Sequence, residues 1–465
     1  MKDLTQGSIT KLLVAMAVPI AAGMVFQTLY FLVDLYFVSR LGDVAIAGVT
    51  AAGTIPFVIM ALTQVLGVGT VALVSHAAGR KDQQEANLVF NQSVLLSAIC
   101  GVLTLVAGYA LSGLYTRSVA ADAATAAAGA TYLYWYAPGL ALQFAVIAMA
   151  SALRGTGIVK PTMVVQMVTV VLNMVLAPIL IAGWGTHVPL GVAGAGLAST
   201  LAIACGVVLL WIYFARLEHY VALHPAQWRP HAKTLMRILG IGLPSGGEFF
   251  MMFIIMAFIY WVIRGFGPAA QAGSGIAFRV MQAIFVPVLA VAFAASPLAG
   301  QNFGAGNAPR VKETFRAGVA LSTLLMLVAT FLCQWRPEAL IRVFTDDPEA
   351  VEVGVLYLKI ISWNFVANGI TFTCSNLFQA LGNTWPSLLS SASRLLTFVL
   401  PALWLSAQPH FELRQLWYLS VASTTLQCVT SFVLLQREFR RKLGPMLAAA
   451  NIVVTEGAPS ARPAR

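Results

Sequence analysis

The chain has 465 residues, of which 59% are hydrophobic and only 10% are charged, and its mean hydropathy is +0.82. These values exclude a soluble globular domain and indicate an integral membrane protein. The net charge of +11 is not typical of a nucleic-acid-binding protein here, because the basic residues follow membrane topology and suit contact with lipid headgroups.

Apolar runs separated by turn signals predict twelve membrane-spanning helices, since about 20 apolar residues cross a bilayer as one helix. The long apolar stretch that begins at Pro161 is divided at 183–191, where glycine and proline residues disfavour a continuous helix. In chain order the predicted helices are 12–38, 45–78, 87–113, 126–152, 161–183, 192–214, 238–263, 270–300, 317–335, 356–380, 387–406 and 415–436.

The second half of the chain repeats the first. Pro19 recurs 225 residues later as Pro244, and several glycine and tyrosine positions recur with the same offset. Because each half holds six helices, both halves enter the bilayer in the same orientation. We therefore predict an all-helical membrane protein with two parallel six-helix repeats, related by a pseudo-two-fold axis along the membrane normal. This plan is typical of a secondary transporter whose substrate site lies between the halves.

The repeat also defines the predicted domain organisation. We expect an N-lobe at 1–215, a cytoplasmic linker at 216–237, a C-lobe at 238–447 and a disordered tail at 448–465. Lys and Arg are concentrated in one set of connecting segments, which by the positive-inside rule places both termini and the linker in the cytoplasm. The first apolar run is too long for a cleavable signal peptide, so we expect it to stay as a membrane helix.

Nothing in the sequence indicates an enzyme, a metal site or a cofactor. The five cysteines fall within predicted spans and form no CxxC or Cys/His cluster. The histidines lie mainly in connecting segments, and no HExxH motif or nucleophile with a base is present. We therefore expect a transporter or another non-catalytic membrane protein.

Asp34 is the clearest functional candidate, because an ionisable residue at membrane depth is costly. Its repeat partner is Ile259, so the second half does not need a carboxylate there. Gln27 and Tyr30 precede Asp34 by seven and four residues and share its helical face. A carboxylate with polar neighbours and little water suits reversible protonation or cation binding. The alternative is an acid at the outer end of the helix that reaches the lipid headgroups.

Glu248 is an acid of the second half that the first half lacks, since its repeat partner is Gly23. Two interpretations stay open for it: a functional carboxylate, or an acid in the first turn of a helix, where the helix dipole favours it. Arg279, Lys359 and Arg394 also fall in or near predicted spans. Pairing with acidic or carbonyl groups would explain these three cations without a function.

The motifs of the chain resemble those of the multidrug and toxic compound extrusion (MATE) family. Pro19 followed by Asp34 resembles the opening helix, and Gly157-x-x-x-Pro161 after the fourth helix and Gly191-Val-Ala-Gly-Ala-Gly in the sixth are similar too. The resemblance covers nearly the whole chain. It implies a bacterial antiporter of the cytoplasmic (inner) membrane, functional as a monomer. Such an antiporter exports small organic compounds, often cations, in exchange for protons or sodium ions.

The resemblance also implies roles for individual residues. Asp34 would be the coupling carboxylate, Asn173 a polar ligand beside it, and Ser199 or Thr200 the source of a nearby hydroxyl. The first helix would bend at Pro19, where a backbone hydrogen bond is missing.

Two positions depart from the family pattern. Many members have an acid four residues after the asparagine, whereas this chain has Ala177. Met252 stands where some members have a glutamate of the seventh helix, and Glu248 lies one turn earlier. One carboxylate with one amide is a poor oxygen set for a bare sodium ion and an adequate one for a proton. The sequence therefore favours proton coupling.

A central cavity lined by aromatic, Met and Gln side chains would suit varied apolar cations. Core packing is the common role of such residues, and we expect fewer than half of the candidates to line the cavity. The candidates are Tyr30, Phe31, Tyr134, Tyr136, Gln143, Met252 and Met256.

Two rival functions fit the sequence less well. A lipid-linked oligosaccharide flippase has a related architecture, but it would favour a strongly cationic cavity for pyrophosphate, and Lys and Arg are scarce on the first two helices of each half. A passive channel or membrane scaffold would not need a single asymmetric carboxylate next to a proline.

Overall fold

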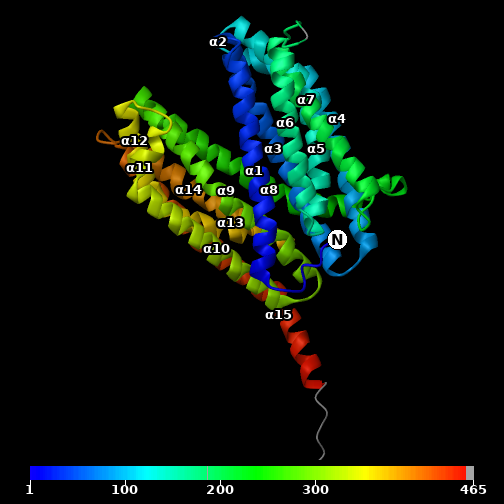
Figure 1. Cartoon of the computed structure of the whole chain (residues 1–465). Helices are drawn as coiled ribbons and strands as arrows, with labels where there is room; N and C mark the ends of the chain where they lie inside the picture. The colour runs from blue at the N-terminus through cyan, green and yellow to red at the C-terminus, as the bar shows by residue number, and fades with distance from the viewer. Residues whose placement is uncertain (186, 457–465) are drawn as a thin grey trace, which may run out of the picture. The chain divides into compact units, whose positions relative to one another are not determined.

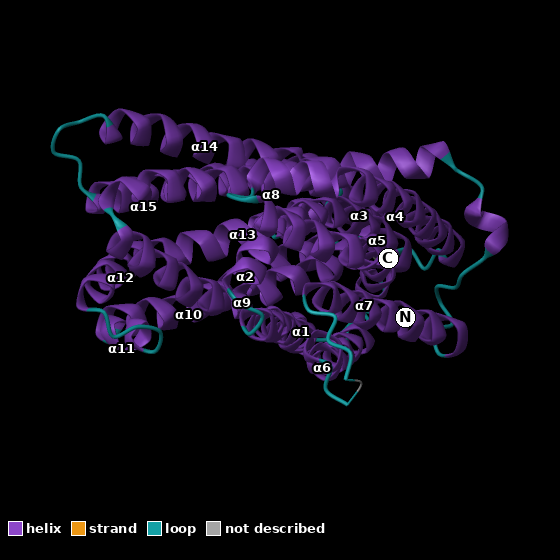
Figure 2. Cartoon of the chain, turned by 90° about the horizontal axis from the view of Figure 1, so that it is seen from above, coloured by secondary structure: helices purple, strands orange, loops and turns teal. Residues whose placement is uncertain are grey.

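The structure is a computed structural model that describes residues 1–185 and 187–456, apart from the side chains of 31, 35 and 449–456. All regular elements within these ranges are helices (Figure 1, Figure 2). Twelve helical segments among them are long and apolar enough to cross a membrane. The predicted all-helical class and the predicted number of spans are thereby confirmed.

The first half contains seven α-helices for its six spans, because one span is divided at Gly53. Gly53 ends the first part and precedes Thr54, where the second part begins. The helices are α1 (Ile9–Ser39), α2 (Asp43–Ala52), α3 (Thr54–Gly79), α4 (Gln83–Val119), α5 (Ala123–Gly155), α6 (Lys160–Ala182) and α7 (Val192–Arg216). The stretch predicted to break between 183 and 191 does so, with Gly183 in the left-handed conformation at the end of α6.

The second half begins earlier than the sequence suggested, since its first helix starts at Ala232 and not at 238. After the short helix η1 (Pro225–Trp228), its helices are α8 (Ala232–Ile263), η2 (Arg264–Phe266), α9 (Pro268–Gly304), α10 (Ala308–Trp335), α11 (Pro337–Arg342), α12 (Pro348–Ile361), η3 (Ser362–Asn364), α13 (Phe365–Ala380), α14 (Trp385–Ser406) and α15 (Leu413–Glu456). Because α15 continues to Glu456, part of the segment predicted as a disordered tail is helical. Residues 457–465 lie outside the described residues.

The chain divides into two compact units. The first contains Met1–Asp3 and Ala15–Phe250, and the second contains Leu4–Val14 and the chain from Met251 onward. The first helix of each repeat is therefore divided between the units: α1 begins in the second unit, and α8 begins in the first. The 217–231 segment that joins the repeats belongs wholly to the first unit.

Glycine allows α3 and α8 to approach closely inside the first unit. A Cβ at Gly69 would overlap the carbonyl oxygen of Ile238, and a Cβ at Gly242 would overlap that of Val65. Both glycines lie within helices and need no special backbone conformation. Glycine is required there because the two helices are too close for a Cβ atom. This crossing fixes the beginning of α8 against α3.

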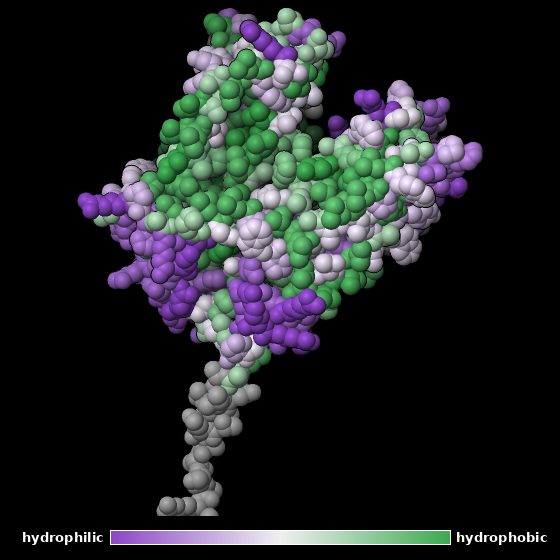
Figure 3. All heavy atoms as spheres, turned by 180° about the vertical axis from the view of Figure 1, so that it is seen from behind, coloured by the Kyte–Doolittle hydropathy of each residue, from purple (hydrophilic) through white to green (hydrophobic). Residues whose placement is uncertain are grey.

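Large hydrophobic side chains on the outside of the helices are consistent with a lipid environment. Val102, Leu103 and Val106 of α4 are more than half exposed, at 61%, 64% and 61%. Broad hydrophobic areas cover the face drawn in Figure 3, and hydrophilic residues gather at their margins. A soluble protein rarely exposes contiguous apolar surfaces of this kind.

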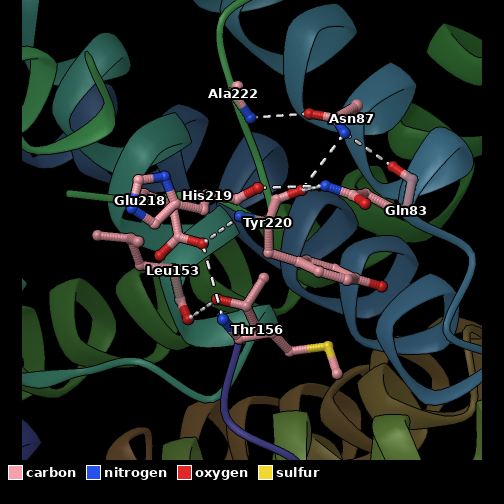
Figure 4. Close-up of polar contacts among 9 residues, drawn as sticks. Gln83, Asn87, Leu153, Thr156, Glu218, His219, Tyr220 and Ala222 are labelled. Carbon is pink, nitrogen blue, oxygen red and sulfur yellow. Dashed lines mark hydrogen bonds and ion pairs between the residues drawn. The ribbon is translucent and has the colours of Figure 1, made fainter. Parts of the chain in front are cut away.

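Side-chain amides of α4 hold the 217–231 segment in place. Gln83 Nε2 donates to the carbonyl oxygens of His219 and Tyr220, at 3.2 and 3.0 Å. Asn87 Nδ2 donates to the Tyr220 carbonyl oxygen at 3.3 Å, and Asn87 Oδ1 accepts from the Ala222 amide at 2.7 Å (Figure 4). These bonds give partners to backbone groups of the part of the segment that precedes η1, which forms no regular element.

Replacing Asn87 with alanine is expected to loosen this segment without unfolding the protein. The change leaves the Ala222 amide without its acceptor and removes a donor from the Tyr220 carbonyl, each worth about 1 kcal/mol. Hydrogen exchange across 217–231 should become faster. Ser97→Ala is the control, because the Ser97 hydroxyl bonds only Val94 of its own helix. Unchanged exchange in Asn87→Ala would contradict the anchoring role.

Candidate functional site

Asp34 lies inside the first unit and not at its surface. It belongs to α1, and only 8% of its surface is exposed. The Tyr132 hydroxyl donates a hydrogen bond to its carboxylate, whereas its Oδ1 atom has no hydrogen-bond partner among the described residues. This burial favours an interior carboxylate over an acid that reaches the headgroups.

Three tyrosines surround the carboxylate. Tyr132 and Tyr136 are one turn apart on α5 and are both nearly buried, with ring centroids 5.4 Å from each other. Tyr30, one turn before Asp34 on α1, interacts with Asp34, Tyr136 and Ser199 of α7. The charge of Asp34 acts on the hydroxyls of all three tyrosines. A carboxylate is thus set among phenol groups on converging helices.

Asn173 of α6 lies at the same level as Tyr30. The two helices touch where Gly23 meets the side chain of Gln166, since a Cβ at Gly23 would overlap it. α1 is the first span and α6 is the fifth, so the two helices run in the same direction. Tyr30 lies seven residues after Gly23, and Asn173 lies seven residues after Gln166, which is about 10 Å along each helix. One turn after Asn173, Ala177 packs in the hydrophobic cluster that also contains the two α5 tyrosines.

The amide of Asn173 is fully buried, at 0% exposure, and neither its Nδ2 nor its Oδ1 has a hydrogen-bond partner among the described residues. Buried polar atoms in native proteins are nearly always paired, so a group without a protein partner indicates a site for an ion, water or ligand. Nowhere in 1–185 and 187–456 do three His, Cys, Asp or Glu side chains gather as metal ligands would. The site offers one carboxylate and one amide.

Asn173→Leu is expected to stabilise the protein and impair its transport. The substitution removes two unpaired polar atoms at similar volume, which relieves about 1 kcal/mol or more. The melting temperature should therefore rise while efflux falls. Asn91→Leu is the matched control, because Asn91 is equally buried but its amide is hydrogen-bonded to Ala222, His224 and Trp228. That variant should melt earlier, and a lower melting temperature for Asn173→Leu as well would contradict the argument.

Two predicted site residues lie elsewhere. The Thr200 hydroxyl donates to the Trp135 carbonyl oxygen at 2.7 Å and accepts from the Gly139 amide at 3.2 Å, so it connects α7 to the backbone of α5. Tyr134 is 53% exposed and packs on Tyr109, 4.8 Å away, in a shallow surface depression. It faces away from the side of α5 that carries Tyr132 and Tyr136.

Glu248 stands in the middle of α8. The helix begins at Ala232 and has no acidic residue in its first turn, so the interpretation of Glu248 as a first-turn acid is wrong. It is half-buried and makes an interaction within the described chain. Ser245, one turn earlier, is fully buried, and its hydroxyl has no hydrogen-bond partner among the described residues.

For the remaining candidates the structure gives the helix and the burial of the side chain. Gln27 and Gln143 are half-buried on α1 and α5 of the first unit, and Pro19 lies inside the unbroken helix α1. Met252 is 47% exposed and Met256 packs on the core of the second unit. The side chain of Phe31 lies outside the described residues.

The first unit also contains an apolar cavity of about 490 Å³. It is lined by α3, α4, α5 and the beginning of α8, with Leu66, Cys100, Phe144 and Leu243 among the lining residues. Its walls are mainly hydrophobic, as is typical of sites that bind organic molecules.

Tyr132 is the site residue that sequence reasoning missed. The sequence showed it only as a position that recurs 225 residues later, as Tyr357. Its spacing of four from Tyr136 would have placed both phenols on one helical face. No sequence signal, however, shows that this face meets Asp34.

Comparison with known proteins agrees with this geometry. The MatE family model matches the chain twice, over residues 19–179 and 244–404, with the same offset of 225 residues that relates the two halves. The chain belongs to the MatE family. It is therefore a multi-pass membrane transporter of that family and not an enzyme.

Similar MatE proteins are found in several bacteria. The probable multidrug resistance protein YpnP of Bacillus subtilis is 27% identical over 381 residues, which cover 82% of this chain and 84% of YpnP. The multidrug export protein MepA of Staphylococcus aureus strain MSSA476 is 26% identical over 380 residues, 80% of this chain and 82% of MepA. The probable multidrug resistance protein NorM of Thermotoga maritima is 26% identical over 397 residues, 84% of each chain.

Solved structures show the same MatE fold. A crystal structure of MATE in the bent conformation superposes with a TM-score of 0.89 at 24% identity and covers 96% of this chain and 98% of that one. MATE in the straight conformation gives 0.86 at the same identity and coverage. The predicted fold of two repeated halves is thereby confirmed.

Proposed function

We propose that this MatE transporter is a proton-coupled antiporter that exports small organic compounds, often cations, with Asp34 as the group that carries the proton. The observation that supports it most is a buried carboxylate with one oxygen free of hydrogen bonds among the described residues, in the same unit as the unpaired amide of Asn173. The names of the relatives, multidrug export and multidrug resistance proteins, support drug export over lipid-linked oligosaccharide flipping or a passive role.

A proton fits the residues better than a metal ion does. Hard cations favour several charged or carbonyl oxygen ligands, whereas this site offers one carboxylate, that of Asp34, and one amide oxygen, that of Asn173, beside neutral hydroxyl groups. Ala177 supplies no second carboxylate. A proton needs only one acceptor, and the Tyr132 hydroxyl can stabilise the deprotonated form by donating its hydrogen bond.

Transport would then follow from competition at Asp34. When Asp34 is deprotonated, its negative charge attracts an organic cation, and the tyrosine rings can contact the cation. Proton uptake neutralises the carboxylate, which weakens that attraction and favours release of the compound. The apolar cavity lined by Leu66 and Phe144 is suited to the hydrophobic part of such compounds. Alternating access of the repeats would connect the two events across the membrane.

We also propose a membrane location and an oligomeric state for the protein. It would lie in the bacterial cytoplasmic membrane as a monomer in contact with lipid, with both termini in the cytoplasm, as the distribution of basic residues favours.

Proteoliposomes loaded with ethidium test the coupling ion. An inward pH gradient should drive ethidium out, and an inward sodium gradient at constant pH should not. Export driven by sodium alone would contradict proton coupling, and export driven by neither gradient would contradict coupled antiport. Liposomes without protein give the background leak.

A further inference from the structure

Arg394 lies on the face of α14 that points into the second unit. Ser391, one turn earlier, and Phe398, one turn later, are both buried on that face. Leu396 and Leu400 occupy the opposite face and are 57% and 60% exposed. The side chain of Arg394 therefore leaves α14 on the face that packs into the protein and not on the lipid-facing side.

Within 1–185 and 187–456, Arg394 forms no ion pair with an acidic side chain. Its Nε atom is buried without a hydrogen-bond partner, and the guanidinium takes part in none of the ion pairs of the described residues. The acids of the second unit that form ion pairs are Glu412 and Glu438, which bind other cations. An uncompensated cation at membrane depth is costly and marks a functional site unless a partner is present.

The register of α14 and α15 places Thr424 at the level of Arg394. Gln427 of α15 donates to the Ser391 hydroxyl of α14 at 3.3 Å, which fixes the level at which these two antiparallel helices meet. Arg394 lies three residues after Ser391 on α14, and Thr424 lies three residues before Gln427 on α15. Thr424 is 0% exposed, and its hydroxyl has no partner among the described residues. The Nε–H group of Arg394 and the hydroxyl of Thr424 thus lie at one level of the contact between α14 and α15, each without a hydrogen-bond partner among the described residues.

Aromatic rings adjoin this pair. Tyr357 interacts electrostatically with Arg394 and stacks edge-on against Trp417, with centroids 4.8 Å apart. Trp417 is fully buried, and its Nε1 donor also has no partner in the described chain. It lies two turns, about 10 Å, along α15 from Thr424. A cation and two further donors without partners therefore lie beside buried aromatic rings.

The repeat shows that this arrangement is specific to the second half. The positions equivalent to Asp34 and Asn173 are Ile259 and Phe398, both buried in the hydrophobic core of the second unit. The position equivalent to Arg394 is Thr169. The second half therefore has neither the acid nor the amide, and its basic group lies one turn before the position equivalent to Asn173.

We propose that the second unit holds a binding subsite for an anionic group of exported compounds, a carboxylate or a sulfonate, with Arg394 as its charge partner and Thr424 as a second donor. Zwitterionic compounds are then substrates alongside simple cations. This inference rests on the proposed function only in taking the ligand to be an exported compound.

Rhodamine B and its ethyl ester test this proposal, because they differ only in whether the carboxylate is free. Equilibrium binding of each dye is measured by fluorescence anisotropy on protein in nanodiscs, with protein-free nanodiscs as background. Arg394→Gln should weaken rhodamine B binding about tenfold or more, the loss of one charge-assisted hydrogen bond, and should change ester binding less than about twofold. Arg394→Lys should recover part of the loss. Arg336→Gln, at an exposed arginine of the same unit, should change neither affinity.

The outcomes separate this subsite from the proposed antiport. Equal weakening of both dyes in Arg394→Gln would assign Arg394 a structural role and overturn the proposal. So would unchanged binding of rhodamine B, or a wild-type protein that binds only the ester. Ester binding also reports whether the variant is folded. Because no gradient is present, a failure of proton coupling would leave these results unaffected.

Discussion

Asp34→Asn is expected to reduce gradient-driven export of ethidium to the level of liposomes without protein. The amide keeps the size of the side chain and can still accept a hydrogen bond from Tyr132, but it cannot take up or release a proton. The site then loses the charge that alternates between the two states of the transporter. Binding of the cation should weaken as well, because its counter-charge is gone.

Asp43→Asn is the control for this variant. Asp43 is an exposed acid at the start of α2, only a few turns further along the chain. Its replacement should leave export within about twofold of wild type, since exposed charges away from a site contribute little. Gradient-driven export that persists in Asp34→Asn would remove Asp34 from the mechanism and direct attention to Glu248, the other carboxylate at membrane depth.

Gly242→Ala is expected to destabilise the first unit severely. The added Cβ overlaps the carbonyl oxygen of Val65, which is backbone and cannot rotate away, so α8 must shift from α3. Overpacking of this kind costs about 1–3 kcal/mol, and more when backbone is involved, against a total stability of about 5–15 kcal/mol. The detergent-solubilised variant should melt well below wild type or fail to elute as a single species.

Gly240→Ala provides a control on the same helix. Gly240 is exposed, and a Cβ there meets no atom within 4 Å. Alanine has the higher helix propensity by about 1 kcal/mol, so this variant should melt at or above the wild-type temperature. Equal melting temperatures for the two variants would show that α3 and α8 do not cross as closely as described.

The repeat and the number of spans could be predicted because both depend on composition and periodicity. Apolar runs of sufficient length must be helices in a bilayer, where every backbone group needs an internal partner. The division of one span at Gly53 was missed, since a single glycine in an apolar run is compatible with a continuous helix. The start of α8 was also misplaced, at 238 and not at Ala232, because Lys233 and Arg237 interrupt the apolar pattern there.

The candidate site could be predicted only in part. Asp34 was singled out because a carboxylate in an apolar helix is costly, and that argument needs no partner. Tyr132 could not be assigned to it, since the contact joins α1 to α5 and depends on how the helices pack. For the same reason a hydroxyl from Thr200 was proposed for the site, whereas the packing of α7 on α5 turns it toward the Trp135 carbonyl.

Proton release on ligand binding tests the central claim most directly. Ethidium is added to purified protein in weakly buffered solution at a pH where Asp34 is partly protonated, and the pH change is recorded with a dye indicator. If proton and compound compete for Asp34, the wild-type protein releases protons as ethidium binds, and Asp34→Asn releases none. Binding without proton release in the wild type, or equal release from both proteins, would contradict the account.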